Sequence, residues 1–238
     1  MRHSLLALAL LTSLAACQKA EAPAAPVATD TPAADAAFAD LSKRALDGWL
    51  QLSPVGATQI GEHKYDAEID DLSAAGRQKN VDFGKKILAE LDALDVSTLS
   101  RENQVDAAIL RNQLQYDLWS AETMQAWAWD PQVYGGVAGS AIYGLMAREF
   151  APLPQRIGSA VSRMEKIPAL LAQARENLDP ARVPKVHAET AAKQNSGILS
   201  IVETFITPNL KELPEAERAR SQKATAELKQ AVAEHQQW

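Results

Sequence analysis

The sequence predicts an all-α fold, a bundle-like domain of several helices, from three observations. Apolar residues recur at steps of three and four positions from about residue 36 onward, which places them on one face of successive helices. Prolines and capping residues separate these stretches, where helices begin and end. Runs that alternate apolar and polar residues, the pattern of a half-buried strand, are missing.

The first predicted helix spans about 36–52 and ends before Pro54, because proline disfavours helical backbone in the preceding residue. Ser100 is predicted to cap a later helix, since its hydroxyl can accept a hydrogen bond from the first turn. The other predicted helices are 73–94, 100–118, 155–177 with an interruption at Pro168, 184–206 ended by Pro208, and 214–238. The large apolar residues expected in the core are Trp49, Leu114, Leu118, Ile157, Val161, Ile201 and Phe205.

The composition suits a folded protein and gives no support to a nucleic-acid partner. The chain has 238 residues, 47% of them hydrophobic, with 24 basic and 30 acidic side chains and a net charge of −6. Phosphate backbones are bound by clustered lysines and arginines, and no such cluster occurs. We therefore expect no binding of nucleic acid.

Residues 1–16 predict an export signal, because Arg2 precedes an apolar run that is too short to span a bilayer. The run ends in "LAAC" at residues 14–17, which resembles the lipobox of bacterial lipoproteins. That resemblance implies cleavage before Cys17, a diacylglyceryl thioether on its sulfur and a fatty acid such as palmitate on the new amino terminus. Gln18, in place of aspartate, implies sorting to the outer membrane, facing the periplasm. The alternative is an ordinary signal peptide followed by a free thiol.

Residues 17–35 join the predicted lipid anchor to the helical region, which we place at 36–238. They are rich in Ala, Pro and Thr and contain almost nothing large enough to pack. Such a segment is a flexible tether, which reaches on the order of 50 Å when extended at about 3.1 Å per residue. Cys17 is the single cysteine, so no intrachain disulfide can form.

One segment, residues 127–144, interrupts the helical pattern with four glycines and four aromatic residues. Glycine permits close approach of the backbone, and Trp and Tyr offer flat faces with a polar edge. Trp127, Trp129, Tyr134 and Tyr143 are therefore candidates for lining a substrate cleft. The alternative is a structural connection whose aromatic side chains fill the core.

No catalytic residue and no metal ligand is predicted. A helical zinc peptidase needs two histidines four residues apart, and none of His63, His187 and His235 has such a partner. Glu234 precedes His235, which is the wrong order for a general base beside a ligand. Serine-hydrolase and phosphate-loop motifs are also absent.

An acidic segment, residues 62–71, concentrates Glu62, Asp66, Asp70 and Asp71. Paired carboxylates can bind a cation or share a proton. The alternative is a segment whose charges face water, which is the usual state of charged runs.

Three stretches in this order resemble the bacterial domain-of-unknown-function 885 family: "LSPVGATQIGEHKYDAEIDDLS" (52–73), "WAWDPQVY" (127–134) and "LPQRIGSAVSRMEKIPALLAQARENLDP" (153–180). The resemblance covers about residues 38–238. It implies a mostly helical, often exported protein that is similar to thermolysin-like zinc metallopeptidases. The family's zinc site lies on a His-Glu-x-x-His helix in its C-terminal half, which has no counterpart here, so zinc is implied for full-length members only.

Two hypotheses follow. The last predicted helix reaches "AEHQQW" (233–238) without a stop, so we expect an interrupted chain whose bundle is incomplete at its C-terminus. Such a chain would be the N-terminal part of a peptidase-like lipoprotein, without zinc-dependent hydrolysis of its own, and would contact a peptide substrate or the missing C-terminal half. The alternative is a complete periplasmic lipoprotein that binds a peptide or protein without catalysis.

Overall fold

The computed structural model describes residues Ala33–Trp238, and every regular element within them is helical, which confirms the all-α prediction. The export signal, Cys17 and most of the tether lie outside these residues. The α-helices are α1 (Ala33–Leu52), α2 (Pro54–Ile60), α3 (Ala74–Asp92), α4 (Arg101–Trp119), α5 (Ala126–Trp129), α6 (Gln132–Met146), α7 (Leu153–Met164), α8 (Ile167–Asn177), α9 (Lys185–Gln194), α10 (Gly197–Ile201) and α11 (Glu215–Gln237). Among these helices, none has the length and apolar character needed to cross a membrane.

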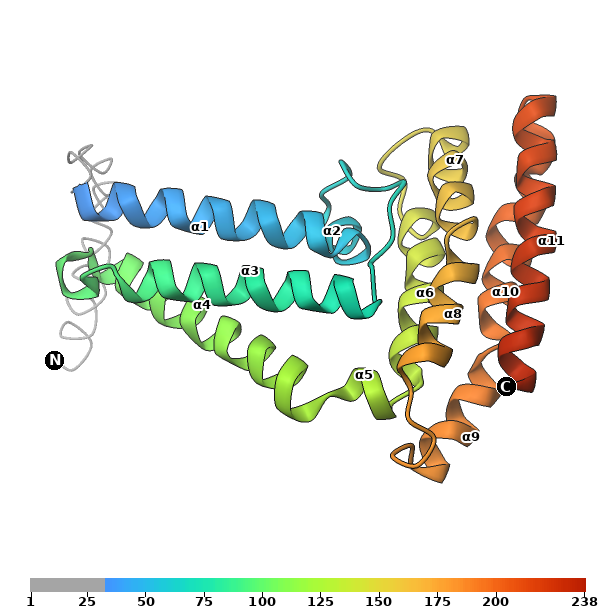
Figure 1. Ribbon diagram of the computed structural model, residues 1–238. Coiled ribbons are helices and arrows are strands. Elements are labelled where there is room, and N and C mark those ends of the chain that lie inside the picture. Colours follow the sequence, from blue (N-terminus) through green and yellow to red (C-terminus); the bar gives the residue numbers. More distant parts are fainter. Residues whose placement is uncertain (1–32) are drawn as a thin grey trace, which may run out of the picture. The chain divides into compact units, whose positions relative to one another are not determined.

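Helices α1, α3 and α4 form the first group of packed helices (Figure 1). Their shared core consists of Phe38, Leu41, Ala45, Ile87, Leu91, Leu99, Ala107 and Leu114. The buried carboxylate of Asp35, at the start of α1, accepts a hydrogen bond of 2.9 Å from the backbone N–H of Ser100. This bond fixes the start of α4 beside the start of α1, and from there α4 runs away from α1 toward α5 (Figure 1).

Helices α6, α7, α8, α10 and α11 form the second group, around a larger apolar core. Its largest fully buried apolar side chains are Tyr134, Ile142, Leu145, Ile157, Met164, Ile167, Leu170 and Leu171. Helix α6 contacts α2, α7, α8, α9 and α10, so other elements cover most of its surface. A helix in that position must be apolar on nearly every face, as the sequence of α6 is.

Helix boundaries follow the local chemistry. The Ser100 hydroxyl accepts a hydrogen bond of 3.3 Å from Asn103 N–H, which confirms the predicted cap of α4. Helix α1 ends at Leu52, as Pro54 predicts. Pro54 also begins α2, which was not expected; proline is tolerated there because the first turn of a helix leaves its N–H groups without partners.

Residues 127–144 are mostly helical, so the predicted interruption there is wrong. They form α5, a two-residue link and most of α6. A Cβ atom on Gly139 would lie 3.6 Å from Ile201 of α10, and one on Gly144 would lie 3.7 Å from Thr58 of α2. Because these glycines allow neighbouring helices to come close, tertiary packing outweighs their low helix propensity.

The predicted single helix over 184–206 is also wrong. Helices α9 and α10 are separated at Asn195 and Ser196, and Val202–Ile206 forms a wider π-helical turn. Pro208 lies inside a following 3-10 turn, Thr207–Glu212. The apolar residues of α10 and of the π-helical turn face the same core, so their pattern continues across the junction, whereas α9 has no buried residue.

The predicted core residues fall into three classes. Burial is confirmed for Leu114, Ile157 and Val161. The residues that are only partly buried are Leu118, Ile201 and Phe205. The prediction is wrong for Trp49, whose side chain is 39% exposed.

Candidate functional site

The exposed ring of Trp49 lines a groove between α1, α3, α4 and the connection at residues 70–72. The groove has a volume of about 760 Å³, within the usual range for sites that bind small molecules or side chains. Its apolar lining residues are Phe38, Ala45, Leu46, Trp49, Leu52, Leu72, Phe83, Leu110 and Leu114. Its polar lining residues are Ser42, Ser53, Asp70, Asp71, Asn80, Asp106, Gln113 and Asp117.

Helix α4 supplies one wall of the groove. Asp106, Gln113 and Asp117 are seven and four residues apart, so they lie on one face of the helix. Gln113 Nε2 donates a hydrogen bond of 2.8 Å to the Asp117 carboxylate, and this bond orients both side chains. The wall therefore combines two carboxylates and a carboxamide with the apolar side chains of Leu110 and Leu114.

The connection before α3 supplies the opposite carboxylates. Asp70 accepts hydrogen bonds from the backbone N–H of Val55 (2.9 Å) and the hydroxyl of Ser53 (3.3 Å). Since Val55 is in the first turn of α2, Asp70 stabilises the start of that helix from outside it. Asp71 accepts from the N–H of Ser73, which itself caps α3 through a 3.1 Å bond from Gly76 N–H.

Arg163 of α7 holds the start of the α2–α3 connection against the second core. Its guanidinium is wholly buried and donates to Thr58 Oγ1 at 2.7 Å. The backbone carbonyls that also accept from it belong to Pro54, Tyr65, Glu68 and Ala141. Burial lowers the pKa of Arg163 to about 10, so the group still carries its charge at neutral pH. One cation thus connects α2, the connection, α6 and α7.

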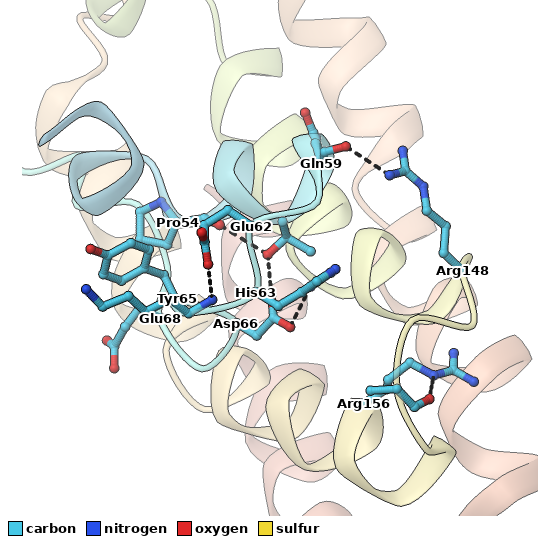
Figure 2. Close-up of polar contacts among 12 residues, drawn as sticks. Pro54, Gln59, Glu62, His63, Tyr65, Asp66, Glu68, Arg148 and Arg156 are labelled. Carbon is cyan, nitrogen blue, oxygen red and sulfur yellow. Dashed lines mark hydrogen bonds and ion pairs between the residues drawn. The ribbon is translucent and has the colours of Figure 1, made fainter. Parts of the chain in front are cut away.

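Figure 2 shows the adjoining contacts of His63 and Asp66 in the same connection. Asp66 accepts from Thr58 Oγ1 at 2.7 Å and lies 3.0 Å from His63 Nδ1. The His63 ring stacks on Phe150 with 3.6 Å between ring centres. Arg148 donates to the Gln59 carbonyl at 3.0 Å (Figure 2). These bonds anchor the acidic segment, so Asp66 is a buried structural residue and does not face water as the solvated alternative requires.

The groove carboxylates differ in their electrostatic environment. Burial raises the pKa of Asp70, although hydrogen bonds from Val55 and Ser53 and the nearby charge of Arg163 oppose this shift. Partial desolvation at the groove rim also raises the pKa of Asp117, against the hydrogen bond from Gln113. Hydrogen bonds from Ser73 lower the pKa of Asp71.

The four aromatic residues predicted to line a cleft do not lie together in this groove, nor do they line another described hollow. Trp127 Nε1 donates to the Ala121 carbonyl at 3.0 Å, and the Arg77 guanidinium lies 4.0 Å from the centre of the Trp127 ring. Trp129 Nε1 donates to the Met124 carbonyl at 2.9 Å. Both rings therefore stabilise the turn between α4 and α6.

Tyr134 and Tyr143 lie on α6 in different environments. Tyr134 is fully buried and its hydroxyl donates to the Trp127 carbonyl at 2.6 Å, so its side chain does not line a cleft in this structure. It fills the core, as the structural alternative predicted. Tyr143 is exposed and packs edge-on against Phe205, with 5.8 Å between ring centres.

The histidines have separate partners. His187 Nδ1 lies 3.0 Å from Asp130 and its ring packs edge-on to Trp129. His235 stacks on Trp238, and burial and the charge of Arg175 lower the pKa of its imidazole. Within Ala33–Trp238, no three His, Cys, Asp or Glu side chains converge as metal ligands. The donor set that catalytic zinc requires is therefore not formed by these residues, and no zinc-dependent step is assigned to them.

Sequence analysis did not identify the groove. The spacing of Asp106, Leu110, Gln113 and Asp117 on one helix face was the available signal. It could not show that α1 and the 70–72 connection would complete the site, because those contacts depend on tertiary structure.

The described residues define an all-α protein with a groove enclosed by three helices. A family model described as "Bacterial protein of unknown function (DUF885)" matches residues 54–238. This match covers well over half of the chain, so the chain belongs to the DUF885 family. The match includes α3, α4 and the 70–72 connection, whereas α1 precedes it.

A solved structure from Shewanella oneidensis, described as a candidate lipoprotein of unknown function, is similar to this chain. The two share 32% sequence identity with a TM-score of 0.79. The similarity covers 84% of this chain and 36% of the Shewanella chain, so this chain corresponds to little more than a third of that protein. A search of curated proteins gave no match.

Proposed function

We propose that this protein is an exported lipoprotein, anchored in the outer membrane through Cys17, whose helical region faces the periplasm and binds peptide segments in the α1/α3/α4 groove. The export signal and the lipobox-like "LAAC" support the anchor. The similarity to a candidate lipoprotein supports the same class of protein. The groove itself carries the proposed binding function, because it combines an apolar floor with a few convergent polar groups.

A peptide suits both parts of this lining. Apolar side chains of a ligand can pack on Phe83, Leu110 and Leu114. The carboxamide oxygens of Asn80 and Gln113 accept no hydrogen bond within Ala33–Trp238. They can accept from backbone N–H groups of an extended segment, which would otherwise lose their partners on leaving water.

The family resemblance implies a similarity to zinc metallopeptidases. We propose that this chain contributes the binding of peptides and that hydrolysis depends on residues that have no counterpart in this chain. The family resemblance supports this division, and so does the share of the Shewanella structure that this chain matches. Binding without catalysis is the second candidate. Zinc content and peptidase activity of this chain, compared with any longer product of the gene, distinguish the two.

The binding function is tested by filling the groove. Ser42 is half-buried on the α1 wall, and a Ser42→Trp side chain would occupy the space of a ligand. Ala39 is exposed on α1 and does not line the groove, so Ala39→Trp is the control. Two capped pentapeptides, Ser-Leu-Lys-Leu-Ser and its norleucine analogue Ser-Leu-Nle-Leu-Ser, serve as probes for calorimetry with the full chain in detergent.

We expect at least one of the two peptides to bind the wild-type protein and the Ala39→Trp variant, and to lose binding in Ser42→Trp. Absence of binding by both peptides would contradict the proposed function. Equal binding to Ser42→Trp and the wild type would also contradict it, because the ligand would then lie elsewhere.

A further inference from the structure

The groove has an unusual distribution of charge. Its lining includes four carboxylates, Asp70, Asp71, Asp106 and Asp117, and no lysine, arginine or histidine. The chain as a whole carries 24 basic residues beside its 30 acidic ones, so a shortage of cations does not explain this. These four negative charges line a concave surface, where the electrostatic field is stronger than on an open face.

None of these four carboxylates makes an ion pair within Ala33–Trp238. Elsewhere in the same residues, thirteen pairs join acidic side chains to lysine, arginine or histidine at 4.0 Å or less. The direct partners of Asp70, Asp71 and Asp117 are hydroxyl, amide and carboxamide donors, all of them uncharged. The groove carboxylates therefore have no cation in direct contact, although the charge of Arg163 acts on Asp70 and that of Lys79 on Asp71.

The carboxylates are also distributed along the groove. Asp106 and Asp117 lie eleven residues apart on α4, whereas Asp70 and Asp71 come from the connection before α3. No three of them converge in the way that metal ligands do. This arrangement favours an extended organic cation over a metal ion, because a long side chain can place its charge near one carboxylate and its aliphatic part on the apolar floor.

We propose that the groove selects peptide segments in which a lysine or arginine side chain is next to an apolar residue. This inference rests on the proposed function and names its class of ligand. The aliphatic stem of the basic residue would pack on Leu110 and Phe83, and its charged end would meet the carboxylates of α4 or of residues 70–71. The exposed ring of Trp49 offers a further face to the cation.

Desolvation supports this assignment. Burial raises the pKa of Asp70, and desolvation raises that of Asp117, which shows that their ionised forms lack full compensation in the free protein. A bound ammonium or guanidinium group would supply the missing positive charge. A nucleic acid or an anionic membrane surface would instead be repelled by these carboxylates.

The test compares the lysine pentapeptide with its norleucine analogue, which keeps the aliphatic stem and removes the charge. We expect the full chain to bind the lysine peptide about three to ten times more tightly at low salt, the range of partly exposed ion pairs. This preference should shrink as salt is added, because ions screen the attraction. Asp117→Asn should reduce it, and the double variant Asp106→Asn with Asp117→Asn should reduce it further, while the norleucine peptide binds both variants as it binds the wild type.

Asp82→Asn is a matched control. Asp82 lies on α3 outside the groove lining and accepts a 2.8 Å hydrogen bond from Gln78, four residues earlier, as Asp117 does from Gln113. Asp82→Asn removes the same charge and replaces the same kind of acceptor, a carboxylate that accepts from a glutamine, by a carboxamide. We expect Asp82→Asn to leave the lysine preference unchanged.

The outcomes separate the two proposals. If both peptides bind equally and Ser42→Trp abolishes both, the groove binds peptides and the charge selection is wrong. If Asp82→Asn lowers the preference as much as Asp117→Asn does, the effect comes from net charge and the selection is also wrong. Spermidine is the third probe: competition by spermidine as strong as by the lysine peptide would identify a polyamine site and overturn the peptide assignment. Absence of binding by either peptide contradicts the proposed function itself.

Discussion

Arg163 is the residue on which the geometry beside the groove most depends. Its buried guanidinium donates to Thr58 and to the backbone carbonyls of Pro54 and Ala141 in buried hydrogen bonds, and to that of Glu68 in a part-buried one. Arg163→Met would keep the aliphatic volume and remove every donor. We expect a loss of about 3–5 kcal/mol in the free energy of unfolding, because buried acceptors would be left without partners.

Urea denaturation followed by circular dichroism measures this loss. Arg148→Met is the matched control, since Arg148 is exposed and donates a single bond, to the Gln59 carbonyl. The control should change stability by less than about 1 kcal/mol. A similarly small effect of Arg163→Met would show that the network does not stabilise the fold as described.

The groove carboxylates predict how peptide binding depends on pH. The pKa values of Asp70 and Asp117 are raised, so on acidification these groups take up protons at a higher pH than an ordinary aspartate does. Protonation removes negative charge, and the affinity for the lysine peptide should therefore fall as the pH is lowered from 7 toward 4. The other charged groups that face them are Asp71, Asp106 and Arg163.

Calorimetric titrations at several pH values measure this dependence, with the norleucine peptide as the control. Its affinity should stay constant over the range in which the protein remains folded. A parallel fall for both peptides would mean that acid acts on the fold and not on the charge of the groove.

At the scale of elements, Gly76 determines how the 70–72 connection meets α3. A Cβ atom at this position would lie 2.1 Å from the backbone oxygen of Asp71, and a backbone atom cannot turn aside. We expect Gly76→Ala to cost roughly 1–3 kcal/mol of unfolding free energy. It should also weaken binding of the lysine peptide, because Asp71 would be displaced.

Gly135→Ala is the matched control for this substitution. Gly135 lies inside α6, and a Cβ atom there would meet nothing within 4 Å. The change should stabilise the protein by about 0.5–1 kcal/mol, since alanine is the better helix former. Thermal unfolding of the two variants measures the predicted loss of stability in Gly76→Ala and the predicted gain in Gly135→Ala. Destabilisation of equal size by both changes would contradict the role given to Gly76.

The sequence predicted those elements whose apolar residues face one core. The regions of α1, α3, α4 and α11 were located to within a few residues, because periodicity, prolines and the Ser100 cap agree there. Helix α6 was missed because its glycines indicate a loop in isolation. They are helical because neighbouring helices pack against them, and a local pattern contains no information on those neighbours.

The groove was less predictable than the helices. Trp49 lies on the apolar face of α1 with Phe38 and Ala45, and periodicity alone predicted that it is buried. Helix α4 runs away from α1 along its length, so α4 does not cover the end of the face that carries Trp49 (Figure 1). The exposure of Trp49 results from the angle between two helices, which depends on the whole structure.

At the scale of the whole molecule, the proposed lipid anchor determines the membrane at which the groove binds its ligand. Cys17→Ala should leave the precursor uncleaved or release the protein from membranes, because the sulfur that carries the lipid is gone. Membrane fractionation and the mass of the mature protein measure this. Gln18→Asp is the control, expected to keep the lipid and to change sorting only; unchanged processing and fractionation of Cys17→Ala would contradict the anchor.

The central claim is that peptides with a basic residue bind between α1, α3 and α4. Amide hydrogen exchange of the full chain, with and without the lysine pentapeptide, tests this location most directly. The account predicts slower exchange on binding in residues 42–53, 70–84 and 106–117. Protection confined to the smaller hollow around Leu178, Asn195 and His235, or no protection at a peptide concentration that saturates binding, would contradict it.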